Sequence, residues 1–101
     1  MSPASPATPA TLAADVAATL QPGFVGTSVP DWLVAAHAGG LASVCLYGDS
    51  ISPDGGLAPV CTDATRRLPG ILLATDEEGG DVTRVHYPAG STAVGNAVLG
   101  R

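Results

Sequence analysis

The sequence contains no lysine, and its positive charge is carried by four arginines. Charged residues make up only 13% of its 101 residues, and nine acidic side chains leave a formal net charge of −5. The phosphate groups of nucleic acids and of anionic lipids are bound by clustered Lys and Arg side chains. We therefore expect no nucleic acid and no membrane among the partners of this protein. The lack of lysine also excludes the lysine-containing phosphate-binding loop of many nucleotide-binding proteins.

Cysteine and histidine are equally scarce, with two of each. Cys45 and Cys61 cannot form a four-ligand metal site, and their spacing fits no redox pair. We expect both to be small buried thiols, and a disulfide between them is the alternative. His37 is expected at the surface near the end of a helix, and His86 has no second histidine at ligand spacing. No dinucleotide-binding glycine pattern follows a predicted strand, so we expect neither a metal nor a cofactor.

Long apolar runs are absent as well, and none approaches the ~18 residues of a membrane span. The first six residues have neither the basic nor the apolar part of a secretion signal, which favours a cytoplasmic location. Residues 1–10 are a low-complexity stretch of Ser, Ala, Thr and Pro, and we predict a disordered lead-in there. Since 46% of the chain is hydrophobic, we expect the remainder, residues 11–101, to fold.

Helical and strand patterns alternate from residue 11 onward. Predicted helices lie between Thr11 and Pro22, between Ser28 and Gly39, and from Leu57 to Leu68; predicted strands cover residues 24–27, 42–47 and 71–75. This order is typical of βαβ units and predicts an α/β fold with parallel strands. Both an open doubly wound sheet and the first part of a (β/α)₈ TIM barrel fit it, and a whole barrel needs about 250 residues. The continuous apolar run at 71–75 favours a strand covered on both faces.

The first two predicted helices carry local signals for their ends and for their buried faces. Thr11 is the predicted N-cap of the first helix. An apolar stripe recurs there every four residues, at Leu12, Val16 and Leu20. Ser28 and Asp31 fit a capping box for the second helix. We expect Trp32, with the alanines that follow it, to form the buried face of that helix.

The acidic loop 76–84 directly follows the apolar strand 71–75. Ligands of parallel α/β proteins bind at the carboxyl ends of strands, which is where Asp76 is predicted to lie. Gly79 and Gly80 allow a close backbone approach, and Arg84 places a guanidinium eight residues after the first carboxylate. A carboxylate that accepts hydrogen bonds from vicinal hydroxyls, beside a guanidinium donor, is a sensible arrangement for binding a sugar. A solvated acidic turn is the alternative interpretation.

Residues 73–85, LATDEEGGDVTRV, resemble the D-[QE]-E-G-G-x-V-x-R segment of glycoside hydrolase family 3. The nearest subgroup is that of the bacterial β-N-acetylhexosaminidases. Residues 39–51 and 88–100 are similar to the segments that precede and follow this motif in the family. Three departures stand out, and one is that the loop and helix between Ile51 and Pro69 are short. Asp49-Ser50 stands where the family usually has Arg-Asn, and Glu77 replaces the more frequent Gln.

This resemblance implies the N-terminal portion of a (β/α)₈ barrel and a retaining β-glycosidase. In such enzymes one carboxylate attacks the anomeric carbon while a general acid protonates the departing oxygen. By the resemblance, Asp76 holds hydroxyls of the non-reducing-end sugar and Arg84 supports the same pocket, whereas Glu77 and Glu78 shape the loop. The nucleophile and the acid/base of the family lie in later segments. We therefore expect no catalytic residue within these 101 residues and no hydrolysis by the chain alone.

The expected partners are a carbohydrate substrate, foremost a β-N-acetylhexosaminide, and the remainder of the same barrel. A non-catalytic sugar-binding or interaction module of the α/β class is the alternative. A nucleotide-binding doubly wound domain is a weaker third hypothesis, because the glycine pattern that binds a pyrophosphate is missing.

Overall fold

The computed structural model describes residues 8–80, 82–85 and 90–100 of the chain. The elements are α1 (Pro9–Ala18), α2 (Asp31–Ala38), β1 (Ser43–Leu46), the 3₁₀ helix η1 (Gly48–Ser50), α3 (Ala58–Arg67), β2 (Leu72–Thr75), β3 (Glu77–Gly79), β4 (Val82–Thr83) and α4 (Asn96–Leu99). β1 and β2 pair in parallel, with Ser43 opposite Leu72 and Leu46 opposite Thr75. The predicted α/β class with parallel strands is thus confirmed, and the described residues do not close into a barrel.

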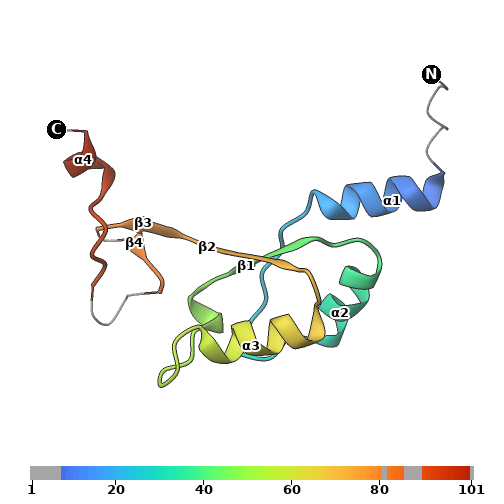
Figure 1. The fold of residues 1–101 in the computed structure, drawn as a ribbon, viewed down its shortest axis with the longest axis horizontal. Helices are drawn as coiled ribbons and strands as arrows, with labels where there is room; N and C mark the ends of the chain where they lie inside the picture. Colours follow the sequence, from blue (N-terminus) through green and yellow to red (C-terminus); the bar gives the residue numbers. More distant parts are fainter. Residues whose placement is uncertain (1–7, 81, 86–89, 101) are drawn as a thin grey trace.

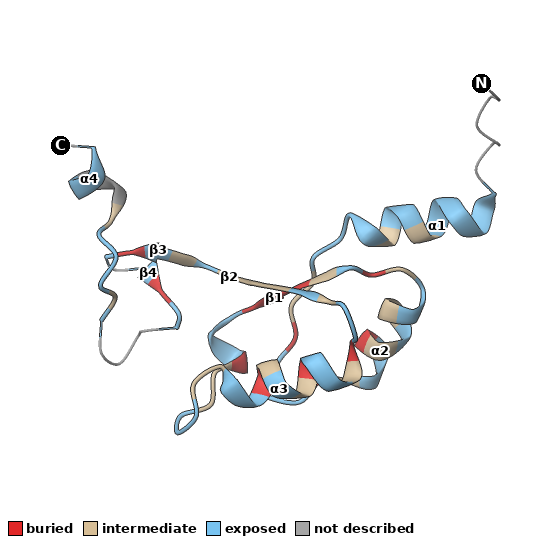
Figure 2. Ribbon diagram, viewed as in Figure 1, coloured by how far each residue is buried: buried red, intermediate tan, exposed pale blue. Residues whose placement is uncertain are grey.

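The helices α2 and α3 lie on the same side of the β1–β2 sheet (Figure 1). The buried core lies between these two helices and the sheet, where buried residues are marked in Figure 2. It includes Leu33 of α2, Val44 and Leu46 of β1, and Val60 and Ala64 of α3. Side chains alternate along a strand, so Cys45 of β1 and Leu72 of β2 face the opposite side. Leu72 is 64% exposed. The expectation that 71–75 is covered on both faces is therefore wrong for the residues described, which cover one face.

The helix α3 uses the face that its apolar spacing predicts. Val60, Ala64 and Leu68 are buried, while Leu57 and Cys61 are partly buried against the same core. Pro59 stands at the start of the helix, where a missing N–H is harmless. Arg66 and Arg67 lie in its last turn, where the negative end of the helix dipole favours positive charge.

A third extended segment, residues 22–26, runs beside β1 on the edge away from β2. The Cys45 backbone N–H donates to the Pro22 carbonyl at 2.9 Å, and that of Gly26 donates to the Asp49 carbonyl at 3.0 Å. The buried hydroxyl of Ser50 donates to the Phe24 carbonyl at 2.9 Å. Residues 24–27 were predicted as a strand, but these bonds are too few to make one. The segment nevertheless lies beside β1 in the position that a neighbouring strand would have.

The helix α1 differs from its prediction at both its start and its apolar face. It begins at Pro9, and Thr8 caps it by accepting a hydrogen bond from the Thr11 backbone N–H at 3.2 Å. Thr11 is therefore not the cap. The stripe of Leu12, Val16 and Leu20 is exposed, because α1 stands away from the core (Figure 1). Residues 1–7 of the predicted lead-in lie outside the described residues.

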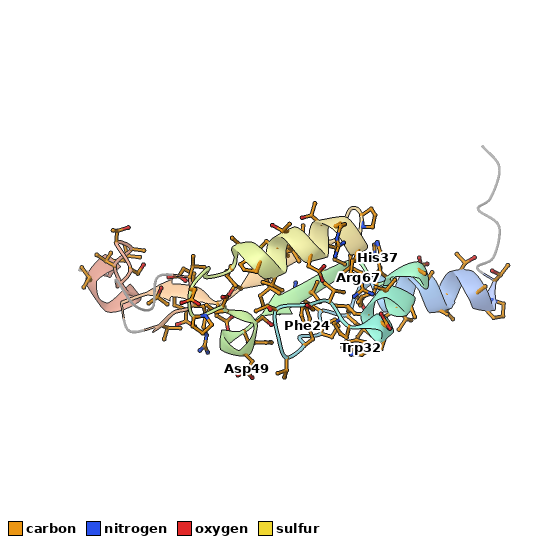
Figure 3. The ribbon with its side chains drawn as sticks, turned by 90° about the horizontal axis from the view of Figure 1, so that it is seen from below. Phe24, Trp32, His37, Asp49 and Arg67 are labelled. Carbon is orange, nitrogen blue, oxygen red and sulfur yellow. The ribbon has the colours of Figure 1, made fainter. Side chains whose placement is uncertain are left out.

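The start of α2 also departs from the prediction. The helix begins at Asp31 with Pro30 at the N-cap position, and no side chain forms a capping hydrogen bond there. The capping box of Ser28 and Asp31 is therefore wrong, because the Asp31 carboxylate pairs with Arg67 at 2.6 Å instead. Trp32 is 52% exposed at the outer surface (Figure 3), and Leu33 takes the buried position.

His37 joins the end of α2 to the segments that precede both parallel strands. Its Nδ1 lies 2.8 Å from the Leu41 carbonyl oxygen, and its Nε2 lies 2.9 Å from that of Pro69. Sequence reasoning placed this residue near a helix end, and the structure adds a bridging role. Both cysteines are free, as expected. Among the described residues, no helix has the length and apolar character that crossing a bilayer requires.

Candidate functional site

The residues that directly follow β1 and β2, Tyr47 and Asp76, are neighbours at the carboxyl edge of the sheet. The pairing of Leu46 with Thr75, continued by one residue, puts Tyr47 opposite Asp76. Alternation along the strands turns both side chains toward the face that α2 and α3 leave uncovered. Asp76 is exposed and directly follows β2, as predicted, although no residue of that strand is fully buried.

The hairpin of β3 and β4 returns the chain to this edge and brings Arg84 with it. The two strands pair antiparallel, with Glu77 opposite Thr83. The guanidinium of Arg84 reaches Gly48, since its Nη1 would be 3.9 Å from a Cβ added at that glycine. Arg84 therefore lies beside the residues that follow β1, although 36 positions separate it from Gly48 in the chain (84 − 48).

Glu77 holds the turn from which the Arg84 side chain projects. Its carboxylate accepts a hydrogen bond from the Thr83 hydroxyl. Its Oε2 also accepts from the backbone N–H groups of Arg84 and Val85, both at 2.9 Å. A carboxylate that receives several N–H and O–H donors fixes the local backbone. Glu77 thus acts as a brace for the loop, and the side chain of Glu78 is exposed.

The glycines of the loop provide a surface for a later segment. Gly79 has φ +80°, and a Cβ there would lie 2.8 Å from the carbonyl oxygens of Ala93 and Val94. The Gly80 N–H donates to the Ala93 carbonyl at 3.2 Å. The space that these glycines leave open is taken by residues 93–95 of the same chain, so the close approach seen there is made by the protein itself.

The charges of Asp76 and Arg84 both act on the Tyr47 phenol. The pKa of the Tyr47 phenol is raised, chiefly by hydrogen bonding with the Cys45 side chain. The negative charge of Asp76 raises this pKa further, whereas the positive charge of Arg84 opposes the rise.

The side chains of Asp76 and Arg84 are available for a ligand, whereas the charged side chains near the core are paired with one another. Asp31, Asp63, Arg66 and Arg67 are engaged in the ion pairs Arg66–Asp63 and Arg67–Asp31, both at 2.6 Å. Within the described part of the chain, no hydrogen bond or ion pair engages the carboxylate of Asp76 or the guanidinium of Arg84. These two groups are free to bind a ligand.

Sequence reasoning identified Asp76 and Arg84 but did not assign a role to Tyr47. The available signal was its position as the last residue of the predicted strand 42–47, parallel to the strand that ends before Asp76. Asp49 lies in η1 and is exposed, at the outer side of the molecule (Figure 3). Asp81 and His86 lie outside the described residues. Among the residues described, no cluster of His, Cys, Asp and Glu side chains could hold a metal ion.

A separate open pocket of about 520 Å³ lies between residues 27–28 and the first half of α3. Asp63 and Arg66, which line it, are already paired with each other. None of Tyr47, Asp76 and Arg84 borders this pocket.

Comparison of the chain with protein-family models, with curated proteins and with solved structures found no match.

Proposed function

We propose that this chain is the N-terminal portion of a retaining β-glycosidase of the family 3 type. Asp76 and Arg84 hold hydroxyl groups of a terminal β-linked sugar, and β-N-acetylhexosaminides are the expected substrates. The catalytic nucleophile and the acid/base belong to segments beyond residue 101. The chain contributes the sugar-binding part of the site.

The observation that carries this proposal is the uncommitted pair of Asp76 and Arg84 at the carboxyl edge of a parallel sheet. A carboxylate offers only acceptors and a guanidinium offers only donors, so together they match the two roles of a sugar hydroxyl. Charge-assisted hydrogen bonds are the stronger kind, and a ligand hydroxyl between the two groups makes both. The site is also at the strand ends where parallel α/β folds bind ligands.

The brace at Glu77 supports the same proposal. A binding group must be held in place if it is to recognise a ligand without paying an ordering cost. Glu77 fixes the backbone N–H of Arg84 at 2.9 Å, and Asp76 is the residue immediately before Glu77. One carboxylate therefore organises the loop, while the preceding one remains available for the ligand.

Sugar binding by the chain is tested by titrating the isotope-labelled protein with N-acetylglucosamine and following backbone amide shifts. We expect shifts confined to residues 47–48, 76–77 and 84–85. Asp76→Asn should weaken binding by about tenfold or more, because a charged acceptor becomes neutral. Arg84→Lys should also weaken it, because a lysine lacks the planar fork. Asp54→Asn changes an exposed carboxylate outside this edge and should leave the affinity unchanged.

Hydrolysis distinguishes the proposal from the alternative of a non-catalytic sugar-binding module. The continuing reading frame should cleave a chromogenic β-N-acetylglucosaminide, and the 101-residue chain should not. Turnover by the longer protein that is unchanged in Asp76→Ala would remove Asp76 from the pocket. Sugar binding without hydrolysis by the longer protein would favour the module.

A further inference from the structure

The aromatic ring of Tyr47 is placed and oriented as a binding surface next to Asp76. We propose that the apolar face of the sugar ring stacks on Tyr47, which makes this residue a specificity determinant of the site. This inference rests on the proposed sugar-binding function and extends it to a residue that the family resemblance does not assign.

Tyr47 lies next to Asp76 at the carboxyl edge of the sheet. Each residue directly follows a member of the last β1–β2 pair, Leu46 and Thr75, on the face of the sheet that α2 and α3 leave uncovered. The side chains of opposed residues on one face lie within contact distance of a common ligand. A sugar whose hydroxyls reach Asp76 therefore extends over the ring of Tyr47.

One edge of the Tyr47 ring is fixed against the backbone. A Cβ added at Gly23 would lie 2.6 Å from Cε2 and 2.7 Å from Cδ2 of Tyr47, so this edge packs directly on that glycine. A fixed aromatic surface binds its ligand with little loss of conformational entropy.

Tyr47 keeps a surface that a ligand can reach. The residue is 41% exposed, and stacking uses the face of its ring rather than its hydroxyl. The face of an aromatic ring carries partial negative charge and attracts partially positive C–H groups. A pyranose with equatorial hydroxyls offers such a face, because its axial C–H bonds point up and down from the ring.

The same geometry predicts different results for different substitutions at this position. Tyr47→Phe keeps the ring and removes a hydroxyl that the ligand does not use, so its affinity for N-acetylglucosamine should stay within about twofold of the wild type. Tyr47→Ala removes the surface and should weaken binding by about tenfold. Trp32→Ala removes another exposed aromatic, on α2 at the other side of the sheet, and should have no effect on affinity.

Gly23→Ala tests the role of the Tyr47 ring by displacing the ring without removing it. The new methyl group cannot share space with Cε2 and Cδ2 of Tyr47, so the ring must move. We expect weaker sugar binding in Gly23→Ala and no additional weakening when Gly23→Ala is combined with Tyr47→Ala. This variant also decides the matter if Tyr47→Ala does not fold, which circular dichroism would reveal.

The deciding measurement is proton NMR of N-acetylglucosamine in the presence of the chain. Stacking shifts the ring C–H protons of the bound sugar upfield, and we expect this shift in the wild type and in Tyr47→Phe but not in Tyr47→Ala. If Tyr47→Ala or Gly23→Ala binds with wild-type affinity and an intact upfield shift while Asp76→Asn does not bind, stacking is overturned and the proposed function stands. If the wild type does not bind the sugar at all, both are overturned.

Discussion

Gly79 occupies a position where backbone conformation and surroundings both exclude a side chain. Its φ of +80° is in the left-handed region, and a Cβ would lie 2.8 Å from two carbonyl oxygens of residues 93–94. We expect Gly79→Ala to destabilise the contact between the loop and residues 93–95 by about 1–3 kcal/mol. Hydrogen exchange of the Gly80 amide, which bonds to Ala93, measures this local opening.

Gly70 provides the matched control for this prediction. It has nearly the same φ, +79°, but nothing lies within 4 Å of an added Cβ. Gly70→Ala therefore carries the backbone strain without the steric clash. If the two substitutions have equal effects on stability, and the Gly80 amide exchanges no faster in Gly79→Ala than in the wild type, the packing argument at Gly79 is wrong.

Individual residues were predictable where local chemistry sets their position, and less so where packing does. Asp76 ends a short apolar strand, and that pattern alone placed it at the edge of the sheet. Trp32 was assigned to the buried face of its helix together with Ala35 and Ala36, but Leu33, one position further, is the residue of α2 that lies in the core. The choice between two adjacent apolar residues on a helix depends on the neighbours, which the sequence of that helix does not contain.

The helix α3 is attached to the segment before α2 through both backbone polar groups of one residue, Val29. The Val29 backbone N–H donates to Asp63 Oδ2 at 2.7 Å, and the Val29 carbonyl accepts from Arg67. Asp63 also receives Arg66. These partners, first the Val29 N–H and then Arg66, hold the pKa of Asp63 below its usual value of 3.8. The attachment therefore depends on the charged form of Asp63.

This dependence gives a pH prediction for the α3 attachment. A carboxyl group whose pKa is lower in the folded state stabilises the fold above its unfolded value of 3.8, and this contribution is lost as the pH falls through the folded value. In urea unfolding between pH 7 and pH 3, we expect Asp63→Asn to be less stable than the wild type at pH 7. The difference should shrink toward pH 3.

Asp54→Asn serves as the control for this pH series, because Asp54 is exposed. Its stability should follow that of the wild type at every pH. A constant gap between Asp63→Asn and the wild type across the whole range would contradict the role of the charged carboxylate.

At the scale of elements, the type and order of the central segments followed from the sequence, but their contacts did not. The spacing of Val60, Ala64 and Leu68 predicted both α3 and its buried face, because these residues have a single core to face. The stripe of Leu12, Val16 and Leu20 has the same periodicity, yet all three are exposed, and Leu20 lies beyond the end of α1 at Ala18. Periodicity shows that a helix has an apolar side, and only the fold shows what covers that side.

The described residues form an extended arrangement, and their buried core lies on one side of the β1–β2 sheet. The radius of gyration is 17.4 Å, whereas a compact domain of about 100 residues has about 13 Å. The hairpin of β3 and β4 and the helix α4 project beyond the carboxyl end of β2, and α1 projects from the opposite end (Figure 1). The second face of the sheet, where Leu72 is 64% exposed, is the surface that further strands of a barrel would cover under the proposed function.

Substitution of Leu72 tests whether further strands cover this face of the sheet. In the 101-residue chain, Leu72→Ser should change the free energy of unfolding by less than about 0.5 kcal/mol, because the side chain is largely in water. Leu33→Ala, at a fully buried position, should cost about 2–5 kcal/mol. Under the proposed function, further strands of the longer protein would bury Leu72 inside a barrel. The serine there should cost about 2 kcal/mol or more, because it replaces a packed apolar side chain with a polar one. Urea unfolding of these three variants and of the unsubstituted protein at each length measures these costs, and an equally small effect of Leu72→Ser in both lengths would show that no barrel closes over this face.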